Sequence, residues 1–156
     1  MFPAVPLGPG RRQREAADST WSAPAQHVQP WLDSLAYRID TPEGSIVITG
    51  DTEPCQSVID IARGADMLVC MCWDDQPATA DCGEANGHTG TTGAAGMAQE
   101  AGVGMLVLTH MNQHISSHGP LEKGLADIGR IYDGQVVFAE QLLRLDLRAE
   151  RGVPDA

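Results

Sequence analysis

The chain has 156 residues, which is the length of one domain and too short for two complete ones. Its formal net charge of −11, from 21 acidic and 10 basic residues, excludes a protein whose whole surface attracts nucleic acid or anionic membranes. No apolar run reaches the roughly 18 residues of a membrane span, and the N-terminal segment lacks the apolar core of a secretory signal. We therefore expect a cytoplasmic protein without a membrane partner.

Residues 1–24 hold four prolines and three arginines without apolar periodicity, which predicts an extended or disordered leader. Organised structure is expected from about residue 25. We place one domain at residues 25–148 and a tail at residues 149–156.

The apolar pattern predicts alternating strands and helices. Pro42 and Gly44 supply the turn of a hairpin, Thr89 is the expected N-cap of the second helix and Gly102 ends that helix. In chain order, the predicted elements are two hairpin strands (35–40 and 45–49), a helix that ends at Gly64, a buried strand (66–71), a polar segment without periodicity (74–87), a helix (89–101), a second buried strand (104–109), an amphipathic helix (121–132) and two final strands (135–139 and 142–147). This order, ββαβαβαββ, indicates an α/β fold.

Two predicted strands end in side chains of the kind that bind metals. Asp51 follows the second hairpin strand, and His110 follows the second buried strand. The C-terminal ends of strands are where α/β sheets build their sites, and carboxylates and imidazoles bind divalent ions. Taken alone, Asp51 is equally typical of a turn residue that caps the next helix. A single histidine in the position of His110 is more often structural or incidental than a metal ligand. His27 and His88 favour a metal site, because the chain has only five histidines.

Two further histidines and two cysteines have other interpretations. His114 and His118 follow His110 at intervals of four residues, but the intervening residues favour a loop over a helical zinc motif, so we expect solvated side chains, with one of them able to reach a substrate. Cys70 and Cys72 lie on one face of a strand and are expected to be buried thiols that act as small apolar residues. A catalytic thiol is the alternative for these cysteines.

Taken together, several segments resemble the second half of metallo-β-lactamase-fold proteins of the ribonuclease Z and arylsulfatase-like branch. The resemblance runs from about residue 25 to residue 147, and the order and spacing of its motifs both fit. The segments are His27, Leu35-Ala36-Tyr37-Arg38, Gly50-Asp51-Thr52-Glu53-Pro54-Cys55, Gly87-His88-Thr89 and Val107-Leu108-Thr109-His110. The fold class that follows is α/β, as the C-terminal half of a metallo-β-lactamase αββα sandwich.

The resemblance implies a role for each residue. His27, Asp51 and His110 match metal ligands, with Asp51 as the carboxylate that bridges two ions, Zn²⁺ or alternatively Mn²⁺. His88 matches the substrate-side histidine and, with Asp51, belongs to the implied catalytic residues. The implied reaction is hydrolysis of a phosphodiester or related ester, in a small molecule or a nucleic acid, by metal-activated water.

The chain departs from the family in two places. Nothing in residues 1–34 supplies the His-x-His-x-Asp-His motif of the N-terminal half, which carries four further ligands. Where ribonuclease Z members have a sequence like His-Glu-Ala-Thr, this chain has Cys70-Met71-Cys72-Trp73, which argues against specific tRNA 3′ processing.

A half-fold would expose the apolar sheet face that normally packs against the other half. We therefore expect a fragment that needs a missing N-terminal half, or a homodimer, and an isolated chain that is inactive. The alternative function is a non-catalytic truncated domain that acts as a dimerisation or interaction module.

Overall fold

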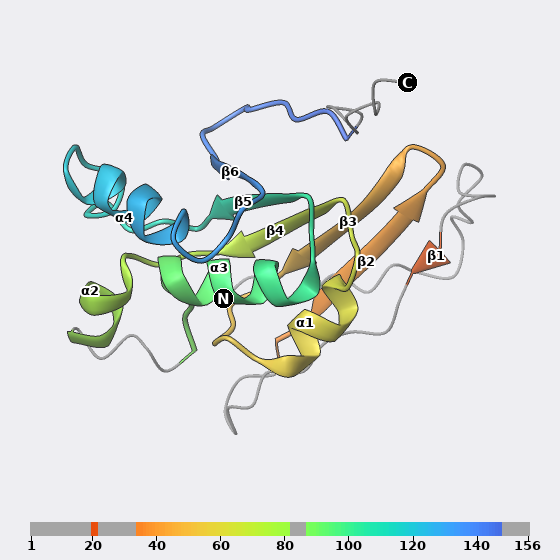
Figure 1. The fold of residues 1–156 in the computed structure, drawn as a ribbon, viewed down its shortest axis with the longest axis horizontal. Coiled ribbons are helices and arrows are strands. Elements are labelled where there is room, and N and C mark those ends of the chain that lie inside the picture. The colour runs from red at the N-terminus through yellow and green to blue at the C-terminus, as the bar shows by residue number, and fades with distance from the viewer. Residues whose placement is uncertain (1–19, 22–33, 82–86, 148–156) are drawn as a thin grey trace, which may run out of the picture.

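The computed structural model describes residues 20–21, 34–81 and 87–147, so His27 lies outside the described residues (Figure 1). Its strands form one sheet in the order β1-β2-β3-β4-β5-β6. They are β1 (Thr20–Trp21), β2 (Ala36–Thr41), β3 (Gly44–Thr49), β4 (Met67–Met71), β5 (Met105–Thr109) and β6 (Gln135–Phe138). Strands β1 to β3 pair antiparallel, whereas β3 to β6 pair parallel. The C-terminal ends of β3, β4 and β5 therefore meet at one edge of the sheet.

Helices connect the parallel strands, as crossover connections require. They are α1 (Gln56–Ala62), α2 (Gln76–Asp81), α3 (Thr91–Ala101) and α4 (Pro120–Ile128). Figure 1 shows α1 and α3 lying along one face of the sheet, with α2 and α4 toward one end. No helix within the described ranges is long and apolar enough to cross a membrane.

The main core lies between the sheet and these helices. Because side chains alternate along a strand, Leu68 of β4 and Leu106 of β5 point into this core, and both are fully buried. Helix α3 contributes Ala94, Ala95 and Ala98, which are also fully buried. These small side chains let the helix backbone approach the sheet closely.

The opposite face of the sheet is apolar but incompletely covered. Met67, Met105 and Val107 form a second buried cluster there. Toward the hairpin, Tyr37 and Ile48 are paired across β2 and β3 and remain 46% and 40% exposed. This face is therefore available to a further layer of structure.

The predicted α/β class is confirmed. The predicted hairpin, the helix before Gly64, both buried strands and the strand near residue 135 are present. Gly102 ends α3 in the left-handed conformation, with φ 65°.

Several boundaries and elements differ from the prediction. The N-cap of α3 is Gly90, because the Thr89 hydroxyl donates a hydrogen bond to the Thr52 carbonyl oxygen instead. Helix α4 ends before Gly129, well short of Tyr132, whose hydroxyl bonds to the core backbone. Residues 142–147 form no strand, since Leu142 has φ 65° and turns the chain.

Two short elements were not expected. Helix α2 lies in the polar segment 74–87. Strand β1 lies within residues 1–24 and pairs with Ile39 and Asp40 of β2.

Candidate metal centre

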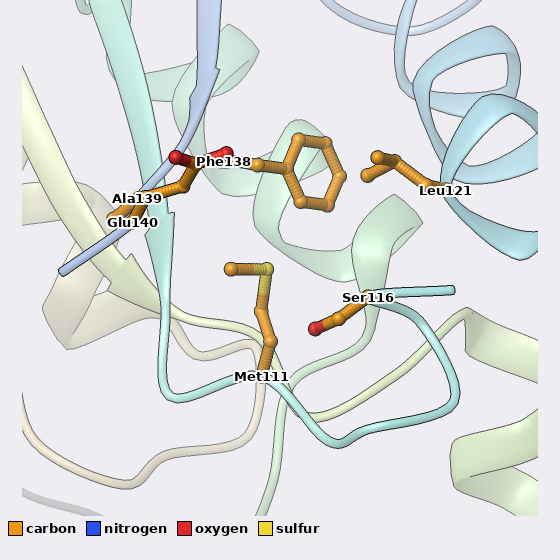
Figure 2. Close-up of a pocket in the computed structure, with 6 residues that line it drawn as sticks. All are labelled: Met111, Ser116, Leu121, Phe138, Ala139 and Glu140. Atoms are coloured by element: carbon orange, nitrogen blue, oxygen red, sulfur yellow. The ribbon is translucent and has the colours of Figure 1, made fainter. Parts of the chain in front are cut away.

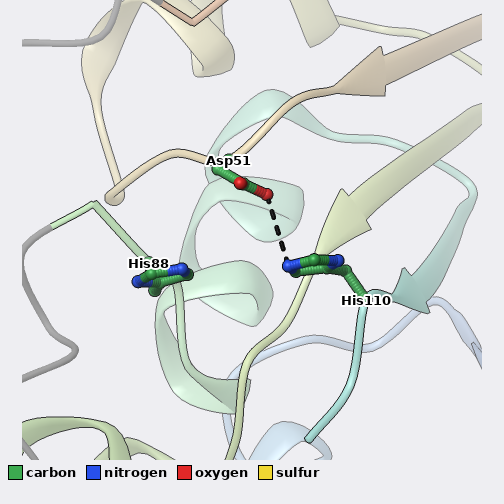
Figure 3. Close-up of side chains that lie close together, drawn as sticks. All are labelled: Asp51, His88 and His110. Carbon is green, nitrogen blue, oxygen red and sulfur yellow. Dashed lines mark ion pairs between the residues drawn. The ribbon is translucent and has the colours of Figure 1, made fainter. Parts of the chain in front are cut away.

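Three predicted site residues lie together at the C-terminal edge of the sheet (Figure 3). Asp51, His88 and His110 each offer one ligand atom, and these atoms lie within 4.8 Å of one another. Nε2 of His110 is 3.6 Å from Oδ1 of Asp51, and these side chains are 50% and 46% exposed. The Asp51 and His110 side chains are therefore accessible to solvent. Carboxylates and imidazoles are donors that a divalent ion of the zinc type binds.

Parallel pairing places Asp51 and His110 side by side, since they follow β3 and β5 on either side of β4. The alternative in which Asp51 caps α1 is wrong, because the N-cap is Cys55 and no side chain caps that helix. His110 has φ 58°, an uncommon conformation for a residue with a side chain. A sharp turn at the end of β5 therefore presents its imidazole.

His88 is held from both flanking residues. The Gly87 amide donates to Oε1 of Glu53 at 2.9 Å. The Thr89 hydroxyl donates to the Thr52 carbonyl oxygen at 2.5 Å. Both acceptors lie in the loop that carries Asp51, so this loop and the His88 segment are tied together.

Trp73, which the sequence analysis did not select, contacts both histidines. Its ring centroid lies 5.0 Å from that of His88 and 5.8 Å from that of His110, with tilted ring planes. Its indole N–H is buried without an acceptor among the residues described. The position of Trp73 in the sequence could have indicated this, because Trp73 follows β4, which lies between the strands that Asp51 and His110 follow.

His114 lies in a loop and its side chain is 52% exposed, as predicted, but it also has a partner that the sequence did not indicate. Its Nδ1 lies 2.8 Å from Oδ1 of Asp74, whose side chain is only 3% exposed. The hydrogen bond and charge of Asp74 raise the pKa of His114. His118 is 92% exposed and contacts Glu122, as expected for a surface histidine.

Cys70 and Cys72 are fully buried, which supports their interpretation as small apolar residues. Burial raises the pKa of each thiol to about 12, so neither is a reactive thiolate near neutral pH. Cys82 lies outside the described residues.

An apolar pocket opens beside the segment that follows His110 (Figure 2). Its volume is about 120 Å³. Its lining residues are Met111, Ser116, Leu121, Phe138, Ala139 and Glu140. Figure 2 shows the Met111 thioether, the Phe138 ring and Leu121 pointing into one space. An apolar surface therefore begins one residue from a candidate ligand.

The model of a family described as the beta-lactamase superfamily domain matches residues 3–111. The chain belongs to this superfamily, and its resemblance to metallo-β-lactamase-fold proteins is confirmed.

Two curated relatives are named ribonuclease BN. The protein from Escherichia coli O139:H28 (strain E24377A / ETEC) is 38% identical over 115 residues. The protein from Shigella boydii serotype 18 is 32% identical over the same length. Each alignment covers 74% of this chain and 36% of the relative, so the chain spans about a third of their length.

Two solved structures share the fold. The metallo-beta-lactamase fold protein YhfI from Bacillus subtilis superposes with a TM-score of 0.64 and 26% identity, over 81% of this chain and 48% of that one. The short form of human tRNase Z gives a TM-score of 0.51 and 22% identity, over 72% and 36% of the two chains. At this identity the second comparison supports the fold alone.

Proposed function

We propose that the chain contributes the metal-binding edge of a hydrolase that cleaves a phosphodiester or related ester. The observation that carries this proposal is the meeting of Asp51, His88 and His110 at the C-terminal edge of a beta-lactamase superfamily sheet. The ribonuclease names of the relatives support a phosphodiester substrate, either a small molecule or a nucleic acid. Zinc is the proposed metal because the donor set combines imidazoles with a carboxylate, and Mn²⁺ is the alternative.

The side chains have separate tasks in this proposal. A bound divalent ion supplies an activated water and stabilises the charge that develops on the substrate. Asp51 and His110 would hold this ion. His88 would donate a proton to the leaving oxygen, as the family resemblance implies, and the hydrogen bonds of its two flanking residues fix its position. His27 stays a predicted ligand outside the described residues.

A complete two-ion site needs more ligands than the three predicted ones, His27, Asp51 and His110. We therefore propose that activity depends on a segment that carries the His-x-His-x-Asp-His motif, in the same chain or in a partner. The partner would cover the apolar face on which Tyr37 and Ile48 are exposed.

Hydrolysis of bis(p-nitrophenyl) phosphate with zinc tests this proposal. We expect little or no turnover by the chain alone and a gain when a segment with the motif is added. Asp51→Ala should abolish the gain, whereas Asp133→Ala, at an exposed carboxylate away from the site, should preserve it. Absence of any gain, or an equal gain with Asp51→Ala, would count against the proposal.

The second candidate is a non-catalytic module that associates through the exposed sheet face. The exposure of Tyr37 and Ile48 favours it. It predicts that Asp51→Ala leaves both the oligomeric state and the amount of bound metal unchanged, as sedimentation velocity and metal analysis would measure.

A further inference from the structure

Residues 72–74 follow β4 and form a connecting segment between the segments that carry His88 and His110. On the His88 side, the Trp73 amide donates to the Thr89 carbonyl oxygen at 2.8 Å. The Thr91 amide donates to the Asp74 carbonyl oxygen at 3.1 Å. The residues just after His88 are thus bound to the connecting segment at two points.

The same segment also binds the chain on both sides of His110. The Cys72 amide donates to the Thr109 carbonyl oxygen at 2.8 Å, immediately before His110. The Asn112 amide donates to the Trp73 carbonyl oxygen at 2.7 Å, two residues after it. The Trp73 ring contacts the His110 ring between these two bonds.

His110 needs this support because its backbone is unfavourable. A φ of 58° costs a residue with a side chain about 1 kcal/mol or more, and such conformations persist only where the surroundings determine them. The hydrogen bonds on either side of His110 supply such surroundings.

A side-chain contact adds a third point of attachment. Nδ1 of His114 lies 2.8 Å from Oδ1 of Asp74, across 40 positions of sequence. The Asp74 side chain is 3% exposed, and its Oδ1 also accepts the Asp75 amide at 2.7 Å. A buried carboxylate oriented in this way fixes the His114 ring, and with it the loop that begins at His110.

The charges around this contact favour its formation. Asp74 and Asp75 both raise the pKa of His114. Lys123 of α4 lies 3.4 Å from Oδ2 of Asp75 and balances part of this negative charge. The connecting segment, α4 and the loop therefore meet around His114.

We infer that the Asp74–His114 pair is a positioning device for His110, because it anchors the loop that holds this ligand in its turned conformation. The backbone bonds nearby form with many residue types, whereas this contact requires a hydrogen-bond donor at position 114 and an acceptor at position 74. The inference rests on the proposed function in so far as His110 binds a metal. His114 itself is a positioning residue and takes no part in proton transfer to substrate.

Cobalt binding by the full chain tests the inference, because the visible absorption of Co²⁺ reports ligand geometry. We expect His114→Ala to weaken Co²⁺ binding about tenfold, as loss of a ligand's supporting contacts does, and to alter the spectrum. His114→Asn should restore both, since its amide nitrogen takes the place of Nδ1 and donates to Asp74. His118→Ala is the matched control on the same loop and should bind like the unmodified chain.

Amide hydrogen exchange of the metal-free chain gives a second measurement, which does not depend on metal. The Asn112 amide should exchange faster in His114→Ala than in the unmodified chain or in His118→Ala. If His114→Ala does not fold, His114→Asn and Asp74→Asn take its place, and Asp74→Asn should show intermediate exchange.

The outcomes separate the two proposals. Unchanged exchange at Asn112, or unchanged Co²⁺ affinity and spectrum in His114→Ala, would overturn the positioning role. Failure of the unmodified chain to bind Co²⁺ would overturn the metal site, and the exchange measurement would still decide whether His114 anchors the loop.

Discussion

Asp51 and His110 occupy their positions for different physical reasons. Asp51 follows Gly50, whose amide donates to the Leu35 carbonyl oxygen at 3.0 Å and where a Cβ would lie 2.7 Å from the Ser34 hydroxyl. A Cβ at this position would also lie 3.3 Å from the Leu35 carbonyl oxygen, so glycine suits the close approach of the two segments. His110 instead keeps a side chain in a conformation that favours glycine.

This strain predicts an order of stabilities at position 110. Both His110→Gly and His110→Ala remove the imidazole, but glycine adopts φ 58° without steric cost. We expect His110→Ala to unfold with a free energy about 1 kcal/mol lower than His110→Gly. Urea unfolding measures the difference, and an alanine variant of equal or greater stability would show that the turn is unstrained.

The buried thiols predict a pH dependence. Burial raises the pKa of Cys70 and Cys72 from 9.0 to about 12 in the folded chain. Above about pH 9 the unfolded chain loses these protons while the folded chain retains them, so the free energy of unfolding should fall from there toward about pH 12.

Cys70→Ala with Cys72→Ala should make the decline shallower, as urea unfolding across this pH range would measure. An equal decline in the double variant would assign it to other groups. Cys55→Ala is the control, because its side chain is only partly buried.

The positions of Asp51, His88 and His110 could be anticipated from their places after strands and from the family resemblance, and the structure brings their side chains together. Their chemical roles remain predictions. The Asp74–His114 contact could not be anticipated, because it joins two loops 40 positions apart and depends on the packing of β4 beside β5. From the local sequence, His114 can be predicted only to lie in a loop.

At the scale of elements, long apolar runs in the sequence predicted strands correctly, whereas weak or short patterns did not. Strands β4 and β5 are continuous apolar segments, which a covered parallel sheet requires. Residues 142–147 have apolar residues typical of a strand, but Leu142 turns the chain and is 90% exposed. Local pattern cannot show whether a neighbouring strand is available for pairing.

Helix α2 was missed because its six residues are too few for apolar periodicity. A capping signal was present, since Oδ1 of Asp75 accepts the Ala78 amide at 2.8 Å and Pro77 lies in the first turn.

Asp75→Ala should therefore lower the free energy of unfolding by about 1 kcal/mol. Asp75→Asn should lower the free energy of unfolding by less, because asparagine also caps helices. Asp81→Ala, at the C-terminal end of α2, removes a carboxylate that the helix dipole disfavours. This substitution should not lower the free energy of unfolding. Thermal unfolding would measure all three, and equal losses at both ends of the helix would contradict a capping role.

At the scale of the whole molecule, the described residues form one sheet with helices on one face and an incompletely covered apolar face opposite. The chain belongs to the beta-lactamase superfamily and spans 36% of the length of its ribonuclease BN relatives. The second face therefore matters as much as the site, because it is where a further layer would pack.

We expect the isolated chain to self-associate through this face as its concentration rises. Ile48→Glu should shift the sedimentation coefficient toward that of a monomer. Leu125→Glu introduces the same charge on exposed α4 and should leave association unchanged. A sedimentation coefficient that is constant with concentration would contradict this expectation.

The central claim is that Asp51 and His110 bind a divalent metal, and counting bound zinc after equilibrium dialysis of the full chain tests it most directly. The unmodified chain and the controls Asp133→Ala and His118→Ala should retain the same amount of zinc. Asp51→Ala and His110→Ala should lose it, whereas His88→Ala should retain most of it because His88 is proposed to act on the substrate. Equal zinc in Asp51→Ala, His110→Ala and the unmodified chain would contradict the claim.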